Sequence, residues 1–332
     1  MFIPPTYGLA VVLCIITMIC WGSWANTQKL ATQKWPFQLF YWDYSIGIIL
    51  LALLLGLTIG SNGEQGRPFL EDLAQADSEA YLAAFTGGVV FNLANLLIVA
   101  AIDLAGMAVA FPIGIGIALV LGVVVNYIAT PVGDPIWLFA GMGLVVVAIV
   151  FDALAYRQLS NKNNTTPTKG ILISVAGGVL MGFFFRFVAA SISTDFNTPE
   201  VGLFTPYSAV FIFALGIFAS NFLWNTFLMY RPLVGEAVQF KDYFQLGTPK
   251  LHLIGILGGM IWCLGMSFSL IASEKAGFAI SYGLGQGATM VAAAWGVFIW
   301  KEFKTAPKSV NPMIALMFSC FIIGLGLIIF AR

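Results

Sequence analysis

The chain has 332 residues, of which 60% are hydrophobic and only 9% are Asp, Glu, Lys or Arg. A typical globular domain has about 25% charged residues, so a water-soluble protein of this size could not hide so much apolar surface. So apolar a chain must have the lipid bilayer as its solvent. Fifteen basic and fifteen acidic residues leave zero net charge, which argues against nucleic acid as a partner.

Ten segments are long and apolar enough to cross a bilayer, which takes about 20 residues. The N-terminus has no basic region, so we expect the first segment to remain as a span instead of being cleaved. The short turns at 103–106 and 273–277 place the apolar segments on either side of each turn antiparallel and adjacent. In chain order the predicted spans are 7–26, 37–59, 81–101, 107–128, 136–156, 170–190, 204–228, 252–271, 278–300 and 312–331.

The two halves of the chain resemble each other. One register aligns the glycine pair at 87–88 with the pair at 258–259, and a slightly different register aligns Tyr44 with Tyr207. Loops of different lengths explain the change of register. The sequence therefore predicts an all-α polytopic membrane protein with ten transmembrane helices arranged as two repeats of five.

These repeats are predicted to occupy residues 1–156 and 170–332, joined by a cytoplasmic linker at 157–169. Because five is odd, the second repeat must enter the membrane in the opposite direction to the first. Inverted repeats are typical of alternating-access transporters. The alternative is the duplication of a purely structural bundle.

Basic residues predict the orientation. Eleven of the fifteen Lys and Arg residues fall in odd-numbered loops, three lie on the other side, and Arg186 lies inside the sixth span. The odd-numbered loops are therefore expected in the cytoplasm, with both termini on the outer side of the cell membrane.

Two charged side chains inside the spans are candidates for function, because charges are expensive in a bilayer. Asp43 lies about 9 Å below the cytoplasmic edge at 1.5 Å per residue. Desolvation favours a neutral carboxyl group, so Asp43 is a candidate proton acceptor or substrate anchor, with a structural carboxylate as the alternative. Arg186 lies nearer the outer side and either snorkels to that interface or serves as a donor in an outer vestibule.

Uncharged polar residues indicate where a solute would bind. Asn92 and Asn95 share one face of the third span, and Gln286 lies between two glycines. Amides offer a donor and an acceptor that match a lactam or urea edge, although they also bridge membrane helices. The aromatic residues expected to stack on a planar solute are Trp21, Trp24, Phe111, Tyr207, Trp262 and Tyr282.

Catalytic and cofactor motifs are not found in the sequence. His252 is the single histidine, and the four cysteines are scattered through apolar stretches, so no zinc site is expected. The sequence contains no GxxxxGK[ST], GxSxG or HExxH motif. We therefore expect neither an enzyme nor a bound cofactor or metal.

Residues 41–45, 87–95, 106–127 and 232–235 resemble the drug/metabolite transporter superfamily and, within it, the ureide permeases. The resemblance implies secondary active uptake, coupled to protons, of planar nitrogen heterocycles such as allantoin, uracil or xanthine. The expected partners are therefore a small-molecule solute and a proton. Asp43 and Asn95 match positions of the family pattern.

One feature departs from the plant members of that family, which have a long loop between their halves. Here the corresponding segment, 157–169, is short. A sugar, polyol or other metabolite transporter of the same superfamily therefore remains an alternative, followed by a non-transporting membrane scaffold. The sequence does not distinguish a monomer from a homodimer.

Overall fold

The computed structural model describes residues 1–31, 35–159, 168–233 and 235–332, without the side chains of residues 107 and 108. Within these ranges the chain is helical, apart from one isolated β-bridge between Ile192 and Phe204. Most of the predicted linker, residues 160–167, lies outside the described residues.

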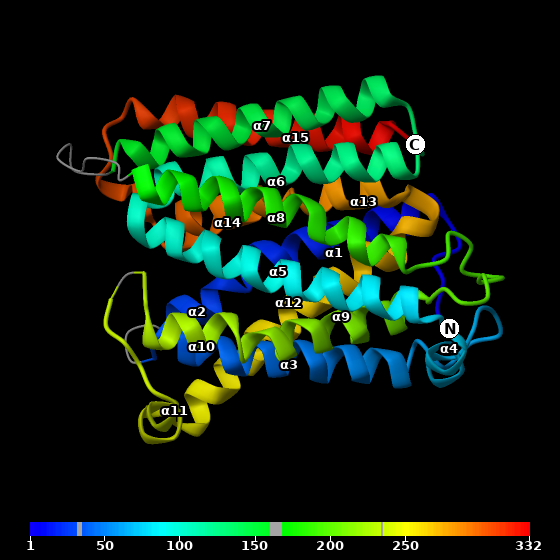
Figure 1. The fold of residues 1–332 in the computed structure, drawn as a ribbon. Helices are drawn as coiled ribbons and strands as arrows, with labels where there is room; N and C mark the ends of the chain where they lie inside the picture. Colours follow the sequence, from blue (N-terminus) through cyan, green and yellow to red (C-terminus); the bar gives the residue numbers. More distant parts are fainter. Residues whose placement is uncertain (32–34, 160–167, 234) are drawn as a thin grey trace.

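The helices run back and forth between the two ends of one bundle (Figure 1). They are α1 (Tyr7–Ser23), α2 (Ala25–Ala31), α3 (Phe37–Leu57), α4 (Phe69–Gln75), α5 (Ser78–Ala105), α6 (Met107–Ala129), α7 (Pro135–Arg157), α8 (Thr168–Ala190), α9 (Pro206–Asn221), α10 (Trp224–Tyr230), α11 (Phe240–Leu246), α12 (Pro249–Ala276), α13 (Phe278–Gly285), α14 (Ala288–Ala294) and α15 (Val310–Phe330). A π-helix covers Trp295–Ile299, and a 3₁₀ helix covers Glu302–Thr305.

Nine helical segments of the described ranges are long and apolar enough to span a membrane. The first combines α1 with α2, the seventh combines α9 with α10, and the others correspond to α3, α5, α6, α7, α8, α12 and α15. The prediction of an all-helical, multi-pass membrane protein is therefore confirmed.

The segment predicted as a continuous ninth span, 278–300, is instead divided into α13, α14 and the π-helix. The first break lies at Gln286, between Gly285 and Gly287. The Gln286 carbonyl accepts hydrogen bonds from the backbone N–H of Thr289 at 3.1 Å and from its hydroxyl at 2.9 Å. Glycine lets the helix pass close to α1, since a Cβ atom at Gly287 would lie 2.2 Å from the sulfur of Met18.

Two matching turns reverse the chain after the longest helices. Gly106 ends α5 with φ 80° and ψ 154°, and Gly277 ends α12 with φ 82° and ψ 153°. This left-handed region is unfavourable for a residue with a Cβ atom. The same backbone turn therefore occurs at the two positions that align in the sequence.

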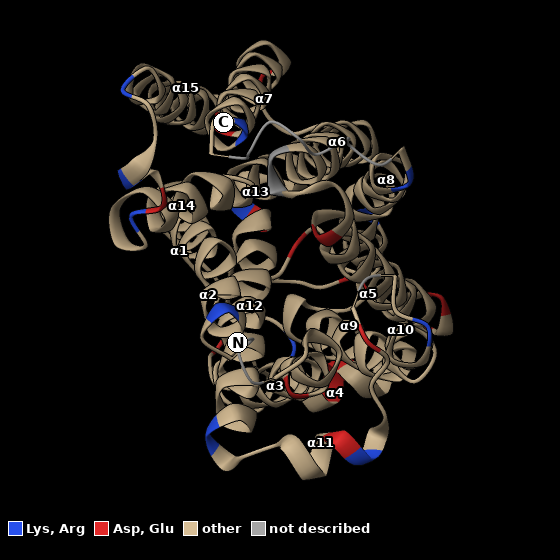
Figure 2. Ribbon diagram, turned by 90° about the vertical axis from the view of Figure 1, so that its left-hand side faces the viewer, with Lys and Arg blue, Asp and Glu red and all other residues tan. Residues whose placement is uncertain are grey.

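The bundle has two distinct ends. Both chain termini lie at one end, where the Asp134 N–H donates to the Ala331 carbonyl at 2.6 Å (Figure 1). The other end, which we call the basic end, contains α2, α11 and the 3₁₀ helix and faces the viewer in Figure 2. The end with the termini is called the terminal end.

Helix packing places three groups side by side along the bundle (Figure 2). Helix α5 packs against α8 and α9, while α12 packs against α1 and α3. Helices α7 and α15 pack together, and α3 contacts α9. The cores of these contacts are buried apolar side chains, and many apolar residues remain exposed on the outer faces, as expected for helices that face lipid.

A buried ion pair lies at the terminal end. Arg67 Nη1 lies 2.9 Å from Asp72 Oδ1, and the Asp72 side chain is fully buried. The second carboxylate oxygen accepts from the backbone N–H of Thr205 at 2.8 Å and from its hydroxyl at 3.0 Å. These bonds fasten α4 to the start of α9.

Candidate functional site

Asp43 is held from two other segments of the chain. Its side chain is 1% exposed, in the second turn of α3. The Tyr243 hydroxyl of α11 donates to its Oδ1, and Nδ1 of His252 on α12 lies 3.0 Å from each carboxylate oxygen. The carboxyl group is therefore contacted from α11 by Tyr243 and from α12 by His252.

Glycines permit this close approach. A Cβ atom at Gly255 would lie 2.4 Å from the Cβ of Asp43, so a larger residue would push α12 away from α3. At Gly247, between α11 and α12, a Cβ atom would lie 2.3 Å from Nε2 of His252. The N-terminus of α12 is also fixed locally, because the Thr248 hydroxyl accepts from the Leu251 N–H.

Aromatic rings surround the histidine. The Trp35 ring lies 5.2 Å from the His252 ring and 5.7 Å from the Tyr243 ring, and Tyr243 and His252 are 4.7 Å apart. Burial, and then the hydrogen bond to Asp43, raise the pKa of Tyr243 above its ordinary value. The phenol therefore keeps its proton and remains a donor to the carboxylate.

Asp43 could be identified from the sequence, but its two partners could not. His252 stood out there only as a potential metal ligand, and Tyr243 lies in a polar segment to which no role was assigned. Both partners lie far from Asp43 along the chain, in the second half. The one available signal was a single histidine at the start of an apolar span.

Asn92 joins α5 to α9. Its side chain is fully buried, and Nδ2 donates to the Ile217 carbonyl at 3.1 Å, to Ser220 Oγ at 2.8 Å and to Asn221 Oδ1 at 3.1 Å. Within the described residues, Oδ1 of Asn92 and Nδ2 of Asn221 have no hydrogen-bond partner. The pair thus has one free acceptor and one free donor.

Asn95 and Gln286 lie in other surroundings. Asn95 donates to the Tyr41 hydroxyl of α3 at 3.1 Å. Gln286, 9% exposed, lies at the break between α13 and α14 beside α1, and its side chain makes no hydrogen bond to another described residue. The three predicted amides are therefore not hydrogen-bonded to one another.

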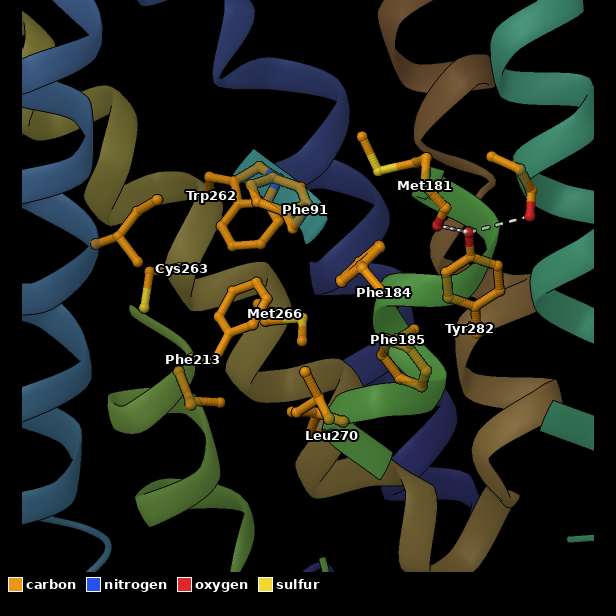
Figure 3. Close-up of a cluster of buried hydrophobic side chains, with 14 of the residues drawn as sticks. Phe91, Met181, Phe184, Phe185, Phe213, Trp262, Cys263, Met266, Leu270 and Tyr282 are labelled. Carbon is orange, nitrogen blue, oxygen red and sulfur yellow. Dashed lines mark hydrogen bonds between the residues drawn. The ribbon is translucent and has the colours of Figure 1, made fainter. Parts of the chain in front are cut away.

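Two of the predicted aromatic residues, Trp262 and Tyr282, belong to a buried cluster in the middle of the bundle (Figure 3), and the partly buried Trp21 packs against it. Trp262 lies 5.9 Å from the Trp21 ring, at an interplanar angle of 15°, and 4.3 Å from the Phe91 ring. Phe91 is 5.0 Å from Phe184, which is 6.4 Å from Tyr282. These rings link α1, α12, α5, α8 and α13 across both halves of the chain.

The other three are dispersed. Trp24 lies 4.8 Å from the Tyr44 ring. The Tyr207 hydroxyl donates to the Phe2 carbonyl at 2.9 Å, at the terminal end. Phe111 is half-buried on α6.

Arg186 lies on α8, near the terminal end, with its side chain partly exposed. It makes no ion pair or hydrogen bond with another described residue.

A cavity of about 510 Å³ lies at the basic end, between α3, α5, α10, Leu233 and residues of the segment 235–246. Three carboxyl groups line it, from Asp103, Glu236 and Asp242, and its described lining contains no Lys or Arg. None of the predicted site residues lines it directly. The cavity is linked to the predicted residue Asn95 only through neighbours. The lining residue Leu96 follows Asn95 in the chain, and the ring of the lining residue Phe37 lies 5.2 Å from the ring of Tyr41, the hydrogen-bond partner of Asn95.

Comparison with known proteins gives consistent results over almost the whole chain. The family model described as ureide permease matches residues 40–169 and 162–331. Ureide permease 1 of Arabidopsis thaliana is 20% identical over 387 aligned residues, covering 99% of this chain and 98% of the relative. Ureide permease 2 of the same plant is 22% identical, with 97% and 96% covered.

More distant similarity extends to bacteria and to solved structures. The glucose uptake protein GlcU of Bacillus subtilis (strain 168) is 25% identical, covering 68% of this chain and 70% of that protein. One solved structure, described as "Crystal structure of protein", has a TM-score of 0.58 at 15% identity, covering 96% of this chain and 97% of the other. At this identity the structural likeness concerns the fold alone.

Proposed function

The chain belongs to the ureide permease family, and from this premise we propose that it imports small, neutral, planar nitrogen heterocycles by alternating access, coupled to protons. The observation that carries the proposal is the family match, which extends from residue 40 to residue 331. A permease is a transporter and not an enzyme. The solutes we propose are ureides and nucleobases such as allantoin, uracil and xanthine.

The helix contacts support an inverted repeat. If the halves are exchanged, α5 corresponds to α12, α8 to α1 and α9 to α3. The contacts of α5 with α8 and α9 then become those of α12 with α1 and α3, and both sets are present. The pairs α7 with α15 and α3 with α9 map onto themselves, as a two-fold axis requires.

Glycine contacts support the same correspondence in detail. A Cβ atom at Gly216 would lie 2.2 Å from the Phe85 carbonyl oxygen, and one at Gly47 would lie 2.0 Å from that of Ile256. Exchanging the halves therefore pairs Gly47 with Gly216 and Phe85 with Ile256. Phe85 and Ile256 are related by the same register as the glycine pairs at 87–88 and 258–259. For α3 and α9, however, the contacts favour a register different from the one that aligns Tyr44 with Tyr207.

The charge distribution supports the proposed orientation. Lys29, Arg157, Arg231 and Lys241 are among the basic residues at the basic end, whereas the terminal end has Arg67, Lys275 and Arg332. Under the positive-inside rule the basic end faces the cytoplasm, and both termini face outward.

The cavity supports a small solute that is not an anion. Its volume of about 510 Å³ falls within the range of about 300–1,000 Å³ that is typical of small-molecule sites. Carboxyl groups on its walls repel anions. Asn95 precedes the lining residue Leu96, and Asn92 lies one turn earlier on α5. The Asn95–Tyr41 and Asn92–Asn221 pairs provide amide donors and acceptors of the kind that recognise a urea or lactam edge.

Asp43 is the proposed coupling residue. It is a buried carboxyl group with two hydrogen-bond donors in a span that is otherwise almost uncharged, and such groups commonly serve as proton relays in transporters. Arg186 is proposed as a residue of the outer vestibule, because it is partly exposed near the terminal end.

A sugar is the second candidate, because this chain is also similar to the glucose uptake protein GlcU. Amides and rings also bind sugars, so the site chemistry alone does not decide between the two.

Uptake into proteoliposomes tests the proposal. Labelled allantoin, uracil, xanthine and glucose are each offered with an acidic outside and, in parallel, without a pH gradient. We expect accumulation of at least one heterocycle that increases with the gradient. Gradient-independent accumulation of glucose alone would overturn the heterocycle assignment, and no uptake of any solute would overturn the proposed import.

A further inference from the structure

We propose that His252 is the proton relay between Asp43 and the aqueous space at the basic end, an inference that rests on the proposed coupling through Asp43. The observation behind it is that the two side chains of this hydrogen-bonded pair differ in their exposure to solvent. The His252 side chain is 27% exposed, whereas the Asp43 side chain is 1% exposed. Water reaches the imidazole but not the carboxylate.

The two ring nitrogens face different partners. Nδ1 lies 3.0 Å from both Asp43 oxygens, and Nε2 lies on the side of Gly247, on the loop that leads from α11 to α12. A neutral imidazole can accept a proton at one nitrogen and release one from the other. The ring therefore connects the carboxyl group with the surface in a single step.

Import in symport with a proton requires the proton to leave Asp43 at the basic end. The Asp43 O–H bond breaks as its proton moves to Nδ1, which forms an imidazolium beside a carboxylate. The Nε2–H proton then passes to water, which leaves Nδ1–H donating to the Asp43 anion. No other reactant is needed, and exposure to water lets the ring exchange tautomers before the next cycle.

The groups around the pair leave this route to His252. Among the described residues, the titratable side chains that contact Asp43 are Tyr243 of α11 and His252 of α12. Tyr243 donates to Oδ1 and keeps its proton, so Oδ2 is the oxygen that remains for exchange with Nδ1. Trp35, packed edge-on against the imidazole at 5.2 Å, holds the ring in this orientation.

Two transport modes separate a relay from a structural role. Net uptake driven by an acidic outside requires proton release at every cycle, whereas exchange of labelled for unlabelled solute does not. For His252→Gln we expect net uptake to fall at least about tenfold, as is typical when an acid–base group is removed, while exchange changes less than about twofold. Gln245→Ala, at an exposed side chain of α11, is the surface control and should leave both modes unchanged.

Chemical rescue distinguishes loss of the imidazole group from misfolding of the variant. In His252→Gly, imidazole added to the medium should restore net uptake in a dose-dependent way, since the position is reached by water. Net uptake of His252→Gln equal to that of the parent chain would overturn the relay, and so would equal loss of both modes without rescue by imidazole.

A solute-independent measurement separates this inference from the proposed function. Because His252 is the single histidine, ¹⁵N-histidine labelling gives nitrogen NMR signals from this ring alone. We expect the proton on Nδ1 in the parent chain and a changed tautomer balance in Asp43→Asn. Identical spectra in the two proteins would overturn the relay, whereas failure of all heterocycle uptake would overturn only the proposed substrates.

Discussion

The crossing of α5 with α9 and the crossing of α12 with α3 have the same backbone contacts but different polar side chains. Cβ atoms at Gly88 and Gly259 would lie 2.1 and 1.9 Å from the carbonyl oxygens of Phe213 and Tyr44, respectively. Both crossings therefore depend on the absence of a side chain. Close approach through small residues is a general feature of membrane helix pairs.

The polar groups of the first crossing have no polar counterparts in the second. Asn92 of α5 donates to Asn221 of α9. When the halves are aligned by their glycine contacts, Cys263 and Ala52 occupy the matching positions. The amide pair is therefore confined to one crossing.

The second crossing has an acid–base pair that the first one lacks. Asp43 of α3 pairs with His252 of α12, and the same alignment places Ile212 and Tyr81 at the matching positions. The comparison indicates that the repeat supplies the scaffold, while each crossing contributes its own chemistry: amides in one and an acid–base pair in the other.

The largest expected effect comes from breaking the shared geometry. Gly88→Leu and Gly259→Leu would each force a side chain into a backbone carbonyl, which should lower the free energy of unfolding by more than about 3 kcal/mol. Thermal unfolding in detergent measures this. Gly143→Leu on α7 is the control, because a Cβ atom there meets nothing within 4 Å; equal melting temperatures for all three variants would contradict the packing described here.

The next effect separates coupling from binding. Asp43→Asn keeps the shape of the side chain but cannot release a proton, so we expect gradient-driven accumulation to fall at least about tenfold. Exchange of labelled solute should persist. Comparing initial rates in the two modes tests this, and accumulation that continues at the parental level would argue against Asp43 as the coupling group.

Substitution in the α5–α9 crossing, which holds the Asn92–Asn221 pair, should change solute affinity and not coupling. Asn92→Leu removes three hydrogen bonds at nearly constant volume, and we expect KM to rise about tenfold in both net uptake and exchange, equivalent to about 1.4 kcal/mol. Cys263→Ala, at the matching position in the other half, should leave KM within about twofold. If both variants behave alike, the assignment of solute recognition to the α5–α9 crossing is wrong.

The smallest effect concerns the donor from α11. Tyr243→Phe keeps the ring contacts but removes a hydrogen bond that stabilises the carboxylate of Asp43. The protonated form of Asp43 is then favoured relative to the carboxylate, so the midpoint of the pH dependence of uptake should move upward by less than about one unit. Tyr230→Phe, at a ring 51% exposed on α10, should leave the midpoint in place; a downward shift in Tyr243→Phe would contradict the donor role.

Much of the architecture could be predicted from local sequence, because a membrane span is recognised from a single apolar segment. The helix containing Asp43 and the turns at Gly106 and Gly277 were predicted for this reason. The division of 278–300 was not, since the glycines on either side of Gln286 are also compatible with a continuous helix.

The partners of Asp43 could not be predicted, because they depend on how distant helices pack. His252 and Tyr243 reach Asp43 only when α11 folds back at Gly247 and α12 crosses α3 at Gly255. In the same way Asn92 on α5 was a candidate from the sequence, whereas its partner Asn221 is known only from the packing of α5 on α9.

Solute-driven proton movement tests coupled transport most directly. Proteoliposomes enclosing a pH-sensitive dye, with the membrane potential clamped and no initial pH gradient, receive external allantoin, uracil or xanthine. We predict acidification of the lumen by at least one of these heterocycles in the parent chain, and none in Asp43→Asn. Entry of the labelled solute with no change in internal pH would contradict proton coupling.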